Sequence, residues 1–137
     1  MTVPGSRCMN LDDVRRLLGA RCLGCSDLLD RPVEEIAATD LMSEVLAYSL
    51  PGTLLLTELC NVQVINTAEV AGLTGVVFVG GSHPAAEVID RANSLAIPTL
   101  AAPLAMSAAR EILDRAGLPV HEHLALGPGT FERPESR

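Results

Sequence analysis

The chain has 137 residues, 48% of them hydrophobic and 20% charged, so it is long enough for one domain with a buried core and too apolar for a disordered chain. Its formal net charge is −7 and its ten basic residues are all arginine. This balance argues against a surface for nucleic acid or anionic membranes, and the lack of lysine excludes a Schiff-base enzyme and a P-loop.

The sequence predicts a cytoplasmic protein. No stretch approaches the roughly 20 apolar residues of a membrane span, and the first ten residues lack a hydrophobic signal region. The four cysteines should therefore stay reduced. With only two Phe, one Tyr and no Trp, the chain also lacks the stacking platforms of single-stranded nucleic-acid binders. We expect no nucleic-acid partner, no membrane partner, no metal and no cofactor.

The N-terminal part begins with residues 1–9, which we expect to be a flexible arm. Asn10 is a favourable N-cap for a short helix that ends at Gly19. The inward face of this helix is aliphatic: Leu11, Val14, Leu17 and Leu18. Residues 20–24 are then predicted to form a strand and residues 26–32 a turn-rich connection.

A second strand is predicted over residues 33–38. Asp40 is expected to cap the helix that follows, which carries Leu41, Val45 and Leu46 and ends before the Pro-Gly turn at Pro51.

The middle of the chain alternates strands and helices. Residues 53–57 and 76–79 are continuous apolar runs, typical of strands buried on both faces. A helix from Asn61 to about Ala71 separates them. The second run is followed by Gly80-Gly81 and then by a helix with Pro84 in its first turn. The buried stripe of this helix is predicted to be Ala85, Val88, Ile89, Ala92 and Ala96.

Residues 97–100 are predicted to form a further strand, and residues 103–116 a helix in which Glu111 and Arg115 pair one turn apart. Its inward residues are expected to be Ala105, Ala109, Ile112 and Leu113. Residues 119–137 are expected to be a mobile tail. The alternation predicts an α/β fold over residues 10–118, in which helices cover a mostly parallel, possibly mixed sheet in three layers.

Four segments resemble the stand-alone DRTGG-domain proteins over residues 10–118. They are residues 40–47 and 52–57 (DLMSEVLA and GTLLLT) and residues 66–69 and 77–84 (NTAE and VFVGGSHP). The resemblance lies in the order and spacing of these segments. Where the family has its Asp-Arg pair and its Thr-Gly-Gly, this chain has Cys60-Asn61 and Val79-Gly80-Gly81, so only the glycines are retained.

The resemblance implies an α/β domain like the N-terminal domain of HPr kinase. It also implies a role, because DRTGG modules are attached to phosphotransacetylases and to CBS-domain pyrophosphatases as regulatory, dimerising or ligand-sensing parts. Some free-standing members are related to iron–sulfur hydrogenases. The catalytic part lies elsewhere in these proteins.

The candidate ligand-binding residues are expected at the carboxyl ends of the two buried strands. Free amides at Gly80, Gly81, Ser82 and His83, before a helix N-terminus, would suit a phosphate or carboxylate. Thr57, Glu58 and Asn61 should border them, because ligands of open α/β sheets bind at this edge. The alternatives are a tight turn in which Ser82 caps the next helix, an Asn61 that is only a cap, and an exposed Glu58.

Other reactive groups have simpler explanations. Cys22 and Cys25 have the spacing of a redox pair or half a zinc site, but we interpret them as small, partly buried residues. The segment His121-Glu122-His123 is expected in the solvated tail. The acidic pairs Asp12-Asp13 and Glu34-Glu35 are expected on solvated faces.

The leading hypothesis is therefore a non-catalytic regulatory or protein-interaction module that forms a homodimer. The second is a sensor that binds a nucleotide or other phosphate-like anion at residues 80–84. The third is an accessory protein of hydrogenase or redox metabolism.

Overall fold

The two apolar runs lie side by side at the centre of a six-stranded sheet in the computed structural model, which describes residues 9–121. β5 (Thr53–Thr57) and β6 (Gly75–Phe78) are parallel, with Leu55 opposite Val76, and every residue of both strands is buried. A strand covered on both faces needs apolar side chains at successive positions, which explains their continuous hydrophobicity.

The whole sheet has the order β2-β7-β6-β5-β4-β8. The remaining strands are β2 (Arg21–Gly24), β4 (Glu35–Ala38), β7 (Thr99–Ala101) and β8 (Val120–His121). All pairs among β4, β5, β6, β7 and β8 are parallel. β2 runs antiparallel to β7, with an irregularity between Cys22 and Gly24. The predicted mostly parallel sheet is thus confirmed, and its antiparallel edge makes it mixed.

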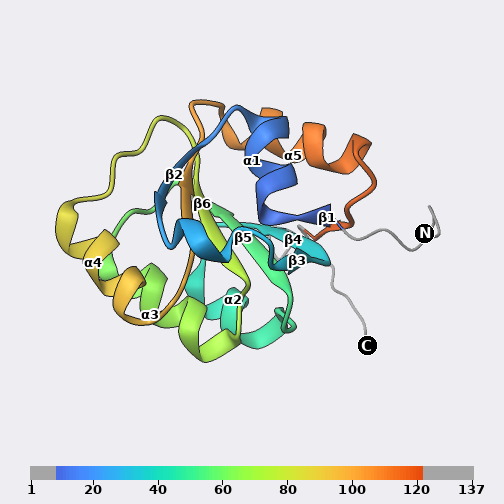
Figure 1. Ribbon diagram of the computed structural model, residues 1–137. Coiled ribbons are helices and arrows are strands. Elements are labelled where there is room, and N and C mark those ends of the chain that lie inside the picture. The colour runs from blue at the N-terminus through green and yellow to red at the C-terminus, as the bar shows by residue number, and fades with distance from the viewer. Residues whose placement is uncertain (1–8, 122–137) are drawn as a thin grey trace.

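Helices cover both faces of this sheet (Figure 1). α1 (Leu11–Leu18) and α5 (Met106–Arg115) lie on one face. The other face carries α2 (Met42–Tyr48), α3 (Val62–Ala71) and α4 (Ala86–Ser94). Because side chains alternate across a strand, Leu54 and Leu56 enter the first core and Leu55 enters the second. The predicted three layers are present.

Two of the predicted helix starts are confirmed by a hydrogen bond from the backbone to the capping side chain. The side chain of Asn10 accepts a hydrogen bond from Asp13 N at 2.8 Å, and the carboxylate of Asp13 accepts one from Asn10 N at 2.9 Å. Gly19 ends α1 in the left-handed region. Asn61 caps α3 through a bond from Val64 N at 3.1 Å. The predicted ion pair between Glu111 and Arg115 is also present, at 2.7 Å.

Some residues lie differently from the prediction. Ala85 and Ala105 are N-caps rather than inward residues, Ala96 follows α4, and all three are exposed, as is Leu17. Pro84 precedes α4 instead of lying in its first turn. For the three alanines, an error of one or two residues at a helix end moves the side chain from an inward position to the surface. Leu17 lies inside α1, but it is exposed next to the buried Leu18.

The two ends of the described chain take part in pairing. β1 (Met9–Asn10) pairs with β3 (Pro32–Val33), and β8 pairs with β4, although we expected residue 9 in the arm and residues 119–121 in the tail. A short 3-10 helix (Ser26–Leu28) occupies the predicted turn-rich connection. The rest of the arm and of the tail, including Glu122 and His123, lies outside the described residues. None of the helices within 9–121 has the length and apolar character needed to cross a membrane.

Candidate functional site

The predicted site residues follow the carboxyl ends of neighbouring strands, and the structure brings several of them together. Ser82 donates its hydroxyl hydrogen toward two carbonyls, Glu58 O at 2.9 Å and Val79 O at 3.0 Å. The loop after β6 is therefore tied to the loop after β5. We call the following residues the carboxyl-end cluster: Asp40, Thr57, Glu58, Asn61, Gly80, Gly81, Ser82 and His83.

Asp40 belongs to this cluster and does not cap a helix, so that prediction was wrong. Its Oδ1 accepts hydrogen bonds from the hydroxyl of Thr57 at 2.7 Å and from Glu58 N at 2.8 Å. α2 has Leu41 as its N-cap, without a side-chain cap bond. Asp40 follows β4, which is parallel to β5, so its carboxylate reaches across to the neighbouring strand rather than forward along its own chain.

Thr57 connects several of these groups. It is fully buried, and its hydroxyl oxygen also accepts a hydrogen bond from Leu59 N at 3.2 Å. Asn61 uses its side chain to cap α3, and Glu58 is exposed, as the simpler explanation of both residues predicts. The polar side chains of Asp40, Thr57 and Asn61 thus bond to the chain itself.

The two glycines of the turn have different surroundings. Gly80 and Gly81 have φ values of +76° and +79°, a region that favours glycine. The amide of Gly80 donates to Leu104 O at 2.7 Å. The prediction that this amide is free to bind an anion was therefore wrong. A Cβ on Gly81 would meet nothing within 4 Å, and nothing in residues 9–121 accepts a hydrogen bond from its amide.

Ser82 is not the cap of α4, because the N-cap is Ala85 and it provides no side-chain bond. The turn therefore reaches the helix through residues 83–85. The cluster also carries two carboxylates, those of Asp40 and Glu58, and His83 is exposed. These carboxylates oppose the approach of an anion at neutral pH.

Cys22 and Cys25 use their thiols separately. Cys22 donates toward the carbonyl of Gly24 at 3.4 Å, and Cys25 lies 3.5 Å from Asn93 Oδ1. Burial, together with nearby Asp27, raises the pKa of the Cys25 thiol, which disfavours the thiolate needed for redox chemistry or metal binding. No group of three potential metal-binding side chains occurs within residues 9–121. This geometry gives the redox hypothesis no support.

Glu35 and His121 form a polar contact that the sequence did not predict. His121 Nε2 lies 2.7 Å from Glu35 Oε1, and Thr53 donates its hydroxyl hydrogen to Glu35 Oε2 at 3.0 Å. Glu35 is thus partly buried and bonded, while Glu34 is exposed as expected. The contact fastens β8 to the start of β4. Its partners are 86 residues apart, too far for a local pattern to show.

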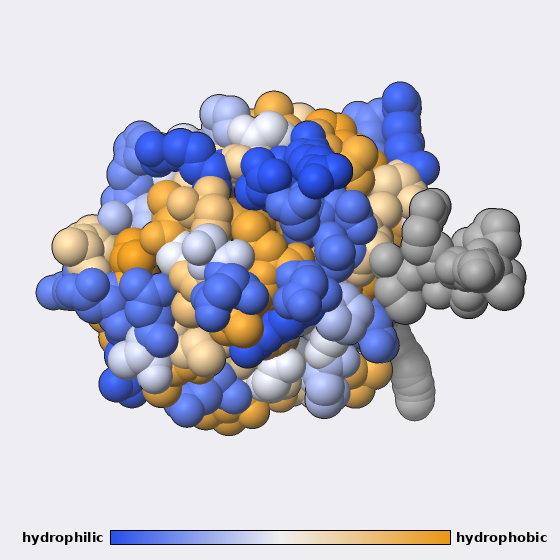
Figure 2. Space-filling model, viewed as in Figure 1, coloured by the Kyte–Doolittle hydropathy of each residue, from blue (hydrophilic) through white to orange (hydrophobic). Residues whose placement is uncertain are grey.

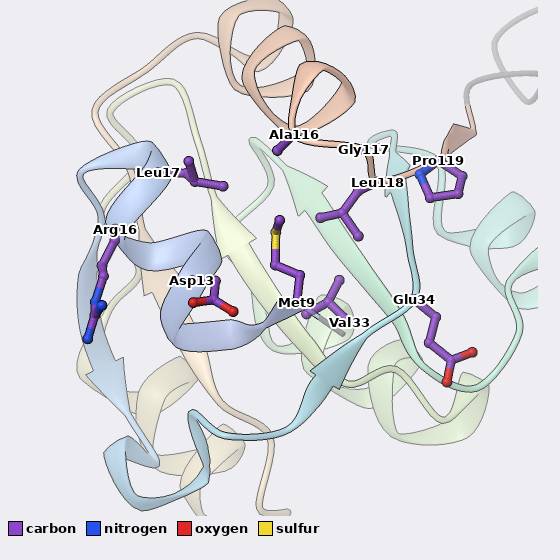
Figure 3. A pocket seen from close by; sticks show the side chains of 10 residues that line it. All are labelled: Met9, Asp13, Arg16, Leu17, Val33, Glu34, Ala116, Gly117, Leu118 and Pro119. Carbon is purple, nitrogen blue, oxygen red and sulfur yellow. The ribbon is translucent and has the colours of Figure 1, made fainter. Parts of the chain in front are cut away.

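A groove of about 610 Å³ lies at the opposite end of the sheet, and sequence reasoning missed it. Its residues come from β1, from α1, from the two residues before β4, and from residues 116–119 between α5 and β8. In Figure 3, Met9, Leu17 and Leu118 point toward the groove, whereas Arg16 and Glu34 point away at its two margins. The groove unites the N-terminal segment with the loop before β8, so no single motif could have indicated it.

Comparison with known proteins establishes the fold. No protein-family model and no curated protein matches this sequence. Its structure is similar to the CBS and DRTGG domains of the regulatory region of Clostridium perfringens pyrophosphatase, complexed with its activator diadenosine tetraphosphate. The TM-score is 0.66 at 15% identity, over 80% of this chain and 47% of that one. The chain thus spans about half of that structure, and the predicted DRTGG-like α/β fold is confirmed.

Proposed function

We propose that this chain is a non-catalytic regulatory module of the cytoplasm that pairs with a second copy of itself. The observation that carries the proposal is the internal bonding of the carboxyl-end cluster. Its best candidates for an acid and a nucleophile, Asp40, Thr57 and Ser82, bond to one another or to backbone groups of the chain. A catalytic nucleophile must reach a substrate, whereas Thr57 is fully buried and the hydroxyl hydrogen of Ser82 is directed at backbone carbonyls.

The fold supports the same proposal, because the similar Clostridium structure is a regulatory region. Fold alone does not assign a function, since one fold carries many functions. The bonding of the residues at the site is therefore the stronger support.

Two measurements on the full chain test the proposal. We expect sedimentation velocity at tens of micromolar to give twice the 14.4 kDa mass of one chain. We expect diadenosine tetraphosphate and ATP to be recovered unchanged after prolonged incubation, as followed by phosphorus NMR. A mass near 14.4 kDa would contradict self-association. Nucleotide turnover that scales with protein concentration would contradict a non-catalytic role.

The second candidate function is a sensor for a nucleotide or another phosphate-like anion at residues 80–84. Its specific support is Gly81, whose amide is unengaged by the described residues and beside which a ligand could approach the backbone closely. The similar Clostridium region is complexed with a nucleotide activator. The carboxylates of Asp40 and Glu58 count against this candidate, which is why it is second.

A glycine substitution separates the two candidates. If the sensor hypothesis is right, diadenosine tetraphosphate or ATP should raise the melting temperature of the wild type but not of Gly81→Val, because the added side chain blocks the backbone. Val at positive φ should itself cost about 1–3 kcal/mol of stability. Gly117→Val is a matched control, because Gly117 has a φ of +101° and also meets nothing within 4 Å, but lies by the groove.

The control variant should keep the response to nucleotide despite a comparable loss of stability. An equal response in wild type and Gly81→Val would exclude the turn as the site. No response in any of the three proteins would leave the regulatory module as the surviving candidate.

A further inference from the structure

Large hydrophobic side chains are exposed on one side of the described chain. Six such residues occur within 9–121, and five of them come from α2, the residues that flank it and α3. We call these five the α2–α3 patch: Leu41, Leu46, Tyr48, Leu50 and Val70. Each is between 50% and 76% exposed. The sixth, Leu17, lies at the groove on the other face of the sheet.

Contacts within the chain bring the segments that carry this patch together. α2 and α3 pack side by side over the same core, through Val45 of α2 and Ile65 and Ala68 of α3. The turn that follows Leu50 reaches the end of α3, since a Cβ on Gly72 would lie 3.9 Å from Pro51. In Figure 2 hydrophobic residues reach the surface along the lower margin, where Figure 1 places these helices.

The patch is apolar where a surface helix is normally polar. α2 buries Met42 and Val45, so Leu46 and Tyr48 lie on its outer side. Residues 41–51 contain a single charged residue, Glu44, and α3 also contains a single one, Glu69. At the border with α4 the surface becomes polar, where Arg91 donates to Asn66 at 3.0 Å.

We infer that the α2–α3 patch is the surface through which two copies of this chain pair, an inference that rests on the homodimer proposed above. Five side chains of this size, each at least half exposed, present on the order of 500 Å² of apolar surface, at the upper end of the ~300–600 Å² of the largest patch on a typical monomer. A stable interface buries about 800 Å² per partner, of which such a patch would be the core and its polar border the rim.

Charge restricts which face a second copy can use. Each chain has a formal net charge of −7, so two copies repel each other over most of their surfaces. A nearly uncharged face is where they can approach with the least repulsion. Under a two-fold axis the same residues meet from both sides, so the apolar patch of one copy would face the apolar patch of the other.

Single charges placed on the patch test the inference. Sedimentation velocity between 1 and 100 µM should show that Val70→Glu and Leu46→Glu each raise the dimer dissociation constant at least tenfold, because each buries a carboxylate at the interface. Leu17→Glu, which adds the same charge to an exposed leucine outside the patch, should leave that constant unchanged. The uncharged Val70→Ser should weaken pairing less than Val70→Glu. Circular dichroism checks that each variant is folded.

The outcomes distinguish this inference from the function on which it rests. If folded Val70→Glu and Leu46→Glu pair as tightly as the wild type, the interface lies elsewhere and only the homodimer survives. The same holds if Leu17→Glu is the variant that dissociates. A wild type that is monomeric throughout the concentration range overturns both the interface and the homodimer.

Discussion

Replacing Phe78 with alanine is expected to lower the free energy of unfolding by about 3–5 kcal/mol, the range for emptying a buried aromatic site. Phe78 has no exposed surface and packs in the core between the sheet and helices α2, α3 and α4. Parallel strands that are covered on both faces leave little freedom for neighbours to move into the cavity, which places the expected loss in the upper part of the range for core substitutions.

Urea unfolding at one fixed protein concentration measures this loss, since self-association makes stability depend on concentration. Leu17→Ala is the control. Leu17 is 42% exposed and lies outside the α2–α3 patch, so its truncation should cost much less than that of Phe78. A loss below about 1 kcal/mol for Phe78→Ala would mean that the core does not depend on this ring.

Asp40→Ala should cost about 2–3 kcal/mol, because it removes a carboxylate that accepts two hydrogen bonds. It also leaves the hydroxyl hydrogen of the buried Thr57 without its acceptor. Asp40→Asn keeps a side chain of the same length with an acceptor oxygen, so it should lose less stability. Asp40→Ser should resemble Asp40→Ala, since a serine hydroxyl is too short to reach the neighbouring strand.

A double-mutant cycle with Thr57→Val separates this role from helix capping. If Asp40 connects β4 to β5, the two substitutions should couple by about 0.5–3 kcal/mol. A helix cap would behave differently, because serine would replace aspartate well and Thr57 would be irrelevant. Full stability of Asp40→Ser together with zero coupling would restore the capping explanation.

The sequence predicted the elements whose causes are local. Continuous apolarity identified β5 and β6, and the asparagines at positions 10 and 61 marked helix starts, because a cap bonds to a backbone group three residues ahead. The same patterns predicted that Glu58 and Ser82 would be neighbours, because adjacent parallel strands end at one edge of the sheet.

The sequence missed what depends on distant partners. The carboxylate of Asp40 satisfies a cap pattern, yet it bonds to residues 17 and 18 positions ahead. The amide of Gly80 appears free in a Gly-Gly turn, but the carbonyl of Leu104 accepts its hydrogen. Neither partner can be inferred without knowing which strands are adjacent. Asp40 could have been included in the predicted site, since it lies two residues after the end of a predicted strand.

The position of β8 has a consequence for how the chain is made. Its pairing with β4 is accompanied by the contact between His121 and Glu35, whose sequence separation is 86 residues. During synthesis the strands from β4 to β7 emerge first and can assemble, while the outer edge of β4 keeps unpaired backbone groups until residues 120–121 leave the ribosome. Such an edge is a template for any other extended chain. The nascent domain is therefore most open to pairing with a neighbouring nascent chain in the interval after β4 has emerged and before residues 120–121 have.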